Sequence, residues 1–155
     1  MCPMSAEAKL TELGLSLPEV ATPVASYVNA VRTGNLLFLS GGLPDLTNEA
    51  FKGQVPSQVT PEVAKDAARN AILGRLAVIR QELGSLDKVT RVVSVQGFVN
   101  AATDFGDVPQ VINGASDTLV EVFGQDIGAH SRTAVGVASL PLNVCVEVAL
   151  VVEVS

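Results

Sequence analysis

The C-terminal stretch Arg132–Val154, with the sequence RTAVGVASLPLNVCVEVALVVEV, constrains the fold more than any other part of the chain. Two runs rich in β-branched residues, Arg132–Ala138 and Asn143–Val154, flank the segment Ser139–Leu142. Such runs favour strands, and the proline at position 141 suits a turn because its φ is fixed. We therefore predict a C-terminal β-hairpin in which Ala138 pairs with Asn143.

This register predicts that a cation and an acid lie on the same sheet face. Side chains alternate between the two faces of a strand, so Arg132 and Glu147 would share a face. Their neighbours on that face are small: Ala134, Gly136, Cys145 and Ala149. The opposite face would be core, with Val135, Val137, Val144, Val146, Val148, Leu150 and Val152. The residues alone leave two interpretations, a structural ion pair at a subunit interface or a ligand-binding site.

Local signals predict three helices upstream of the hairpin. Ser5 is suited to cap a short helix, Ala6–Leu13, that ends at Gly14. Thr60 and Pro61 begin a long helix whose apolar residues recur every three or four positions until Gly84. A further helix is expected to begin at Asp107-Val108-Pro109 and to end at Gly124.

The remaining segments predict strands and loops. Strands are expected over Tyr27–Arg32 and Leu36–Ser40, joined by a turn at Thr33–Asn35, and over Thr90–Val99. Residues 43–59 are predicted to be a loop, with a short strand near Phe51.

The expected order of elements is β-β-α-β-α-β-β, which predicts an α+β fold with one mixed sheet and two helices on one face. At 155 residues the chain is most simply one domain, residues 1–155, with 1–23 as an N-terminal extension that carries a short helix. This arrangement leaves the other sheet face uncovered. We therefore expect the chain to form an oligomer that buries this face.

Composition excludes several classes of partner. Hydrophobic residues make up 48% of the chain, but no run approaches the roughly 20 apolar residues of a membrane span. No signal peptide is recognised at the N-terminus, and Cys2 and Cys145 are expected to be free thiols in the cytoplasm. A formal net charge of −6 with ten dispersed basic residues disfavours nucleic-acid binding.

Three segments together resemble the Rid family (YjgF/YER057c/UK114, also labelled endoribonuclease L-PSP). They are Arg32–Gly41 after Tyr27, Arg132–Pro141 and Val146–Val148, and the likeness extends from about Val24 to Val154. The resemblance implies a chorismate-mutase-like fold and a homotrimer with ligand clefts between subunits. It also implies hydrolysis of reactive enamines and imines, such as 2-aminoacrylate, to 2-ketoacids and ammonia, without a cofactor.

The resemblance also assigns roles to individual residues. Arg132 matches the arginine that holds the substrate carboxylate, and Glu147 matches the acid near the attacking water. Cleft-lining positions correspond to Tyr27, Ser40, Gly41, Asn113 and Ala134. Departures from the family pattern are Ala134, where many members have cysteine, Gly42, where glutamine is usual, and His130, where proline is common.

The chemistry of these residue types is compatible with imine hydrolysis. An arginine binds a carboxylate through a planar fork, and a partly buried glutamate can move a proton between water and a departing amine. One histidine without paired ligands disfavours a metal site, so none is expected. The alternative function is a non-catalytic homotrimer that senses or sequesters a small carboxylate. An endoribonuclease and a chorismate mutase are disfavoured by the acidic charge and by the few cationic groups.

Overall fold

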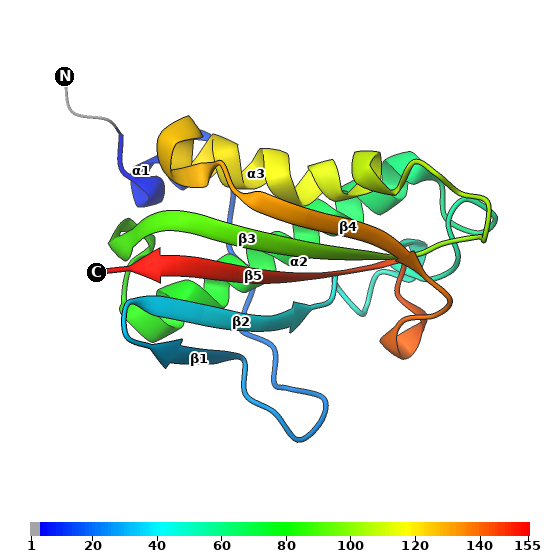
Figure 1. Ribbon diagram of the computed structural model, residues 1–155, viewed down its shortest axis with the longest axis horizontal. Helices are drawn as coiled ribbons and strands as arrows, with labels where there is room; N and C mark the ends of the chain where they lie inside the picture. Colours follow the sequence, from blue (N-terminus) through cyan, green and yellow to red (C-terminus); the bar gives the residue numbers. More distant parts are fainter. Residues whose placement is uncertain (1–3) are drawn as a thin grey trace.

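A computed structural model describes residues 4–155, so Cys2 lies outside the described residues. A five-stranded sheet packs against two long helices, and a third, short helix lies near the N-terminus (Figure 1). The helices are α1 (Ala6–Glu12), α2 (Pro61–Leu83) and α3 (Val108–Gly128). The strands are β1 (Ala30–Thr33), β2 (Leu36–Gly42), β3 (Val89–Asn100), β4 (Ser131–Val137) and β5 (Val146–Val154). The predicted α+β fold and order of elements are confirmed.

The helix boundaries follow their sequence signals closely. The hydroxyl of Ser5 accepts the N–H of Ala8 at the start of α1, and the hydroxyl of Thr60 accepts that of Val63 at the start of α2. Gly84 ends α2 in the left-handed conformation, with φ 87°. Helix α3 continues beyond the predicted stop, because Gly124 only kinks it, with φ 79°, before the last turn.

Two smaller predictions differ from the structure. The first strand begins at Ala30 rather than Tyr27, and the segment near Phe51 is a 3₁₀ turn, Glu49–Phe51, rather than a strand. The side chain of Asn48 caps this turn by accepting the N–H of Ala50, which is a local interaction that competes with strand formation.

The predicted C-terminal hairpin is wrong. The strand order is β1-β2-β5-β3-β4, so β3 lies between the two C-terminal strands and pairs in parallel with β4 and antiparallel with β5. The segment after β4 therefore passes across the end of β3, by way of a short 3₁₀ turn at Pro141–Asn143, before β5 begins. The physical reason is burial: strand β5, with its many valines, is covered on both edges, by β2 and β3, only when it lies in the middle of the sheet.

The corrected topology also changes which residues share a face. Arg132 pairs with Val95, which in turn pairs with the buried Leu150, so Arg132 lies on the face that the helices cover. Glu147 pairs with Phe98, which pairs with the exposed Val135, so Glu147 lies on the open face. Arg132 and Glu147 thus lie on opposite faces of the sheet, and the prediction that they share one is wrong.

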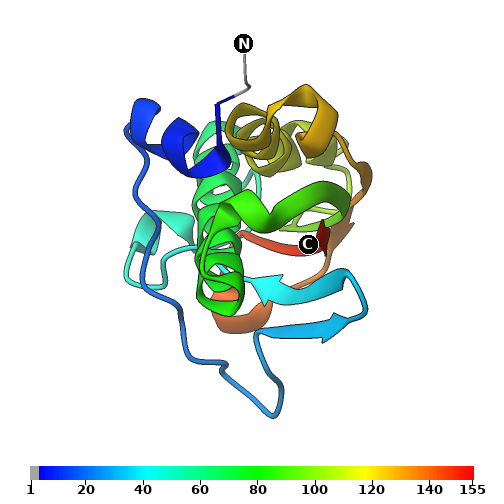
Figure 2. The same ribbon diagram turned by 90° about the vertical axis from the view of Figure 1, so that its left-hand side faces the viewer.

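Helices α2 and α3 cover one face of the sheet and lie against each other (Figure 2). Their contact is very close at Gly114, where an added Cβ would overlap the carbonyl oxygen of Lys65 in α2. The core between these helices and the sheet includes Ala64, Ala68, Ile72, Leu76, Ile112, Leu119, Val95, Val148 and Leu150. The free thiol of Cys145 is also buried, which raises its pKa to about 11.

The N-terminal segment is fastened to the helix layer. Glu7 in α1 accepts two hydrogen bonds from Arg80 in α2, at 2.6 and 3.1 Å, and one from the N–H of Leu86 at 2.9 Å. The hydrogen bonds from Arg80 lower the pKa of the Glu7 carboxyl. From α1 the chain runs along the helix side of the molecule to β1 (Figure 2), and it thereby covers part of α2.

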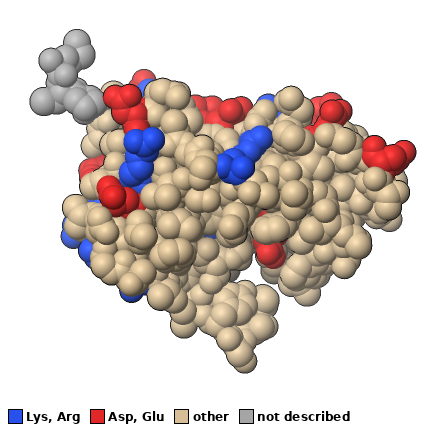
Figure 3. Space-filling view, viewed as in Figure 1, with Lys and Arg blue, Asp and Glu red and all other residues tan. Residues whose placement is uncertain are grey.

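The other face of the sheet has no helix over it and is turned to the reader in Figure 1. Large apolar side chains on this face are exposed, among them Val31 (55%), Phe38 (44%) and Val135 (42%). Few charged side chains interrupt it (Figure 3). Such a surface is typical of a protein–protein interface, and it supports the expectation of an oligomer. Within the described residues, no helix is both long and apolar enough to span a bilayer.

Candidate functional site

Arg132 projects from the edge strand β4 toward the side of α3. Its Nη1 donates to Oδ1 of Asn113 at 2.8 Å and to the hydroxyl of Ser116 at 3.2 Å, and its Nη2 reaches the carbonyl of Pro109 at 3.4 Å. Ala134 lies two residues further along the same face and packs against the core. The guanidinium is therefore fixed by the first turns of α3.

These contacts leave part of the guanidinium free. Of its five N–H groups, both on Nη1 and one on Nη2 have acceptors, whereas Nε and the second N–H of Nη2 have none in residues 4–155. Nε and Nη2 form one of the two forks with which arginine binds a carboxylate. Arg132 is thus held in place while one fork stays available.

His130 supports Arg132 indirectly, through the hydroxyl of Ser116. His130 Nδ1 lies 2.6 Å from the carbonyl of Gly128, so Nδ1 carries the proton and donates. Its Nε2 then accepts the hydroxyl of Ser116 at 2.9 Å, which leaves the oxygen of Ser116 to accept from Arg132. The hydrogen bonds among His130, Ser116 and Arg132 therefore each have one defined donor and acceptor.

Glu147 lies on the open face of β5, beside the backbone of Gly41 at the end of β2. An added Cβ at Gly41 would lie 2.6 Å from Oε2 of Glu147, so only glycine lets the carboxyl come this close. Burial raises the pKa of the Glu147 carboxyl above its usual value, and the charge of Arg75 opposes this shift with a smaller effect. A carboxyl group with a raised pKa is suited to accept and return a proton near neutral pH.

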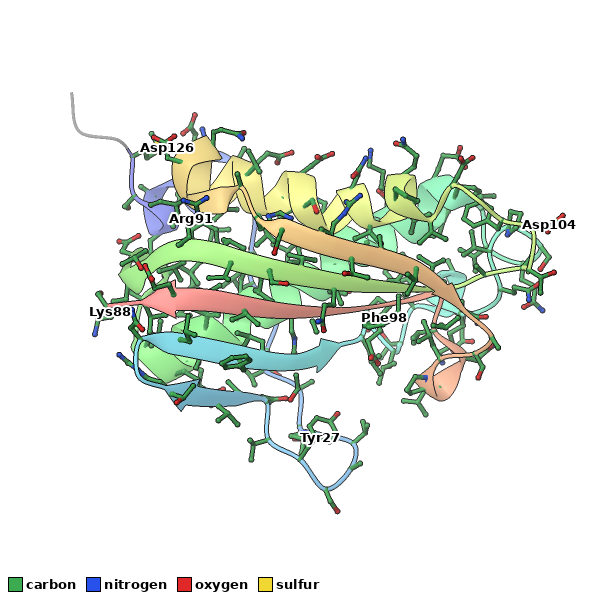
Figure 4. All side chains as sticks on the ribbon, in the orientation of Figure 1. Tyr27, Lys88, Arg91, Phe98, Asp104 and Asp126 are labelled. Carbon is green, nitrogen blue, oxygen red and sulfur yellow. The ribbon has the colours of Figure 1, made fainter. Side chains whose placement is uncertain are left out.

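Tyr27, Ser40 and Gly41 surround the same end of β2. Tyr27 is 43% exposed and lies on the loop that leads into β1, whereas Phe98 lies on the open sheet face (Figure 4). Tyr27 and Gly41 both line a cavity of about 350 Å³. The hydroxyl of Ser40 donates to the carbonyl of Val28 at 2.6 Å, which ties the loop to β2. Ser40 is therefore a structural support here, and within residues 4–155 its hydroxyl proton goes to a backbone carbonyl rather than to a base.

The structure thus separates the predicted site residues into two groups. The arginine group, on the helix-covered face at the edge of β4, contains Arg132, Asn113 and Ala134. The glutamate group, at the end of β2, contains Glu147, Tyr27, Ser40 and Gly41. Because the two groups lie on different faces of one sheet, an Arg132–Glu147 ion pair does not form within one chain. A site that uses both groups needs a second copy of the chain.

Sequence reasoning missed Arg75 and Ser116. Arg75 is 5% exposed and lies on the buried stripe of α2, three residues after Ile72 and four before Ile79. A charged residue at the spacing of a core stripe is a signal that could have been used. Ser116 follows Asn113 by three residues on α3, so both face the same side of the helix.

Comparison with known proteins identifies the family. A family model described as "YjgF/chorismate_mutase-like, putative endoribonuclease" matches residues 7–154. The chain belongs to the YjgF, or Rid, family. Protein TCP17 of Trypanosoma cruzi is 40% identical over 149 residues, which cover 96% of this chain and 93% of that protein. A 2-iminobutanoate/2-iminopropanoate deaminase of Dermatophagoides farinae is 32% identical over 142 residues, which cover 90% and 94%.

A solved structure agrees with this assignment. The protein Atu1372 of Agrobacterium tumefaciens, whose function is unknown, has a TM-score of 0.88 and 39% identity, with 97% of this chain and 92% of that chain covered. The YjgF fold is known in oligomers. An oligomer would bury the exposed sheet face and could bring the two separated groups of site residues together.

Proposed function

We propose that this YjgF-family protein is an imine and enamine deaminase whose active site is assembled between copies of the chain in a homotrimer. Arg132 of one copy holds the substrate carboxylate, and Glu147 of a neighbouring copy handles the water and the proton. The observation that carries this proposal is the division of the site residues between the two sheet faces. The carboxylate-binding Arg132 lies on one face, and the proton-transferring Glu147 lies on the other.

The reaction is the hydrolysis of a 2-imino acid. The substrate enters as the protonated iminium. Glu147 in its ionised form accepts a proton from water as the water oxygen bonds to the iminium carbon, which gives a carbinolamine. Glu147 then returns this proton to the amine nitrogen. As the C–N bond breaks and ammonia leaves, the hydroxyl group gives its proton to Glu147, which releases it to solvent, and the former water oxygen becomes the ketone of a 2-ketoacid. An enamine enters the same sequence after it takes up a proton on carbon.

Three features of the chain support these roles. The free fork of Arg132 suits a carboxylate, since it binds both oxygens in one plane. The raised pKa of Glu147 places its titration nearer to the working pH than that of an ordinary carboxyl group. The 32% identical deaminase of Dermatophagoides farinae carries the name of this reaction.

A coupled assay tests the proposal. An amino-acid dehydratase generates 2-iminobutanoate from threonine, and the protein is expected to accelerate the release of 2-oxobutanoate over spontaneous hydrolysis. Release at the spontaneous rate would refute the deaminase. If 2-oxobutanoate then still raised the melting temperature, the alternative of a non-catalytic carboxylate-binding trimer would be favoured, for which the Ala134 and Gly42 departures provide the reason.

A further inference from the structure

Arg75 in α2 is a buried cation without an ion-pair partner in the part of the chain that the structure describes. Its side chain is 5% exposed, and no carboxylate of residues 4–155 lies within ion-pair distance. Among the described residues the guanidinium makes one hydrogen bond, from Nη1 to the carbonyl of Ser40 at 2.9 Å, whereas the buried Nε has no acceptor there. An unpaired buried charge lowers the stability of the folded protein. Packing alone therefore does not explain an arginine at this position.

The charges around Arg75 do not supply that partner. Burial lowers the pKa of Arg75, and the charge of Glu147 opposes this shift with a smaller effect. Glu147 does not form a hydrogen bond with the guanidinium. The remaining N–H groups of Nη1 and Nη2 therefore have no acceptor in residues 4–155.

A cavity of about 350 Å³ lies beside this guanidinium. Arg75 and Tyr27 line it together with Gly41, Leu43 and Asn70, and residues of the N-terminal segment between Pro18 and Val24 line it as well. The volume is that of a site for a small organic molecule. Gly41 also contacts the carboxyl group of Glu147, so the cavity adjoins the glutamate group.

The Arg75 side chain occupies the space beside Gly42, where there is no side chain. An added Cβ at Gly42 would overlap Nε of Arg75 and lie 2.8 Å from its Cδ. The guanidinium from α2 thus fills the space that a side chain at position 42 would need. The absence of a side chain at Gly42 is therefore what lets Arg75 reach the wall of the cavity.

We propose that the cavity beside Arg75 is a subsite for a second acidic group, so that the substrates are imines of dicarboxylic amino acids. This inference rests on the proposed function. With the 2-carboxylate on Arg132 and the imine carbon at Glu147, the substrate side chain extends into the cavity and its terminal carboxylate meets Nη1 and Nη2 of Arg75. Tyr27 and Leu43 pack against the methylene groups between the two ends.

Binding of product analogues to the intact protein tests the subsite by calorimetry. We expect 2-oxoglutarate to bind about tenfold more tightly than 2-oxohexanoate, which has a similar chain length and no second acid. In Arg75→Met the affinity for 2-oxoglutarate should fall about tenfold, while 2-oxohexanoate binds as before. Arg91→Met, at an exposed arginine of β3, is the control and should change neither. Arg75→Lys, which keeps the charge, should retain part of the preference.

Turnover separates this inference from the proposed function. Imines made in situ by amino-acid oxidases from glutamate and from 2-aminobutyrate should both be hydrolysed, with kcat/KM higher for the glutamate imine and the difference lost in Arg75→Met. Hydrolysis of both imines at equal kcat/KM, together with equal binding of the two ketoacids to the wild-type protein, would overturn the dicarboxylate subsite alone. If neither imine is hydrolysed faster than it is spontaneously, the proposed function is overturned. In that case a tenfold binding preference for 2-oxoglutarate would still support an acid-binding cavity.

Discussion

Replacing Glu147 with glutamine should reduce kcat/KM for imine hydrolysis by a factor of about 10² to 10⁴, the range typical of a lost general acid–base group. The amide keeps the shape of the side chain beside Gly41 but cannot take a proton from water. The coupled ketoacid assay measures the loss. Glu153→Gln is a matched control, because Glu153 lies on the same face of β5 and contacts Thr90 rather than the cavity. Equal activity of the Glu147→Gln variant and the wild type would remove Glu147 from the mechanism.

The pH dependence should separate this effect from a loss of structure. Since burial raises the pKa of Glu147, the wild-type kcat/KM should fall as the pH drops through a value above the ordinary 4.5 of a glutamate. In the folded protein this carboxyl group holds its proton to a higher pH than in the unfolded chain. Its ionisation therefore lowers the free energy of unfolding as the pH rises through that window. The glutamine variant avoids this loss, so above the window it should melt no lower than the wild type.

Replacing Gly114 with alanine should lower the free energy of unfolding by about 3 kcal/mol, at the upper end of the usual cost of overpacking. The added methyl group would overlap the carbonyl oxygen of Lys65 and lie 2.9 Å from its carbonyl carbon, so backbone rather than a flexible side chain would have to move. Helices α2 and α3 would separate along the whole of their contact. The melting temperature, measured at fixed protein concentration, should fall by roughly 6–12 °C.

A second glycine serves as the control with the opposite sign. Gly74 lies within α2 and an added Cβ would meet nothing within 4 Å. Gly74→Ala should therefore raise the stability, by up to about 1 kcal/mol, because alanine has the higher helix propensity. A Gly114→Ala variant that melts at the wild-type temperature would show that the helices can adjust their distance freely.

The helices could be predicted from the sequence because their signals are local. Thr60-Pro61 and Gly84 mark the ends of α2 through caps and a left-handed residue, and these interactions depend on neighbours in the chain. Gly124 shows the limit of such signals. A glycine with positive φ can kink a helix as well as end it, and the tertiary contacts of the last turn decide between these outcomes.

The pairing of the C-terminal strands could not be predicted in the same way. Two β-branched runs joined by a short proline-containing segment suit a hairpin and a crossover equally well. The choice depends on β3, which is more than thirty residues away from β4 and whose alternating valines need a neighbour on both edges. Arg132 and Glu147 were singled out by residue type and motif, but the sheet face on which each lies depends on this strand pairing, and the prediction that they share a face was therefore wrong.

Mixed oligomers test most directly whether the active site is shared between copies. Arg132→Met and Glu147→Gln are each expected to be inactive alone. When the two are coexpressed with different tags and purified as mixed trimers, a site that takes Arg132 from one copy and Glu147 from its neighbour is intact at about one of the three seams in each trimer. The mixed trimers should therefore regain about a third of the wild-type activity. Mixed oligomers that stay as inactive as the two variants would contradict a site assembled between copies.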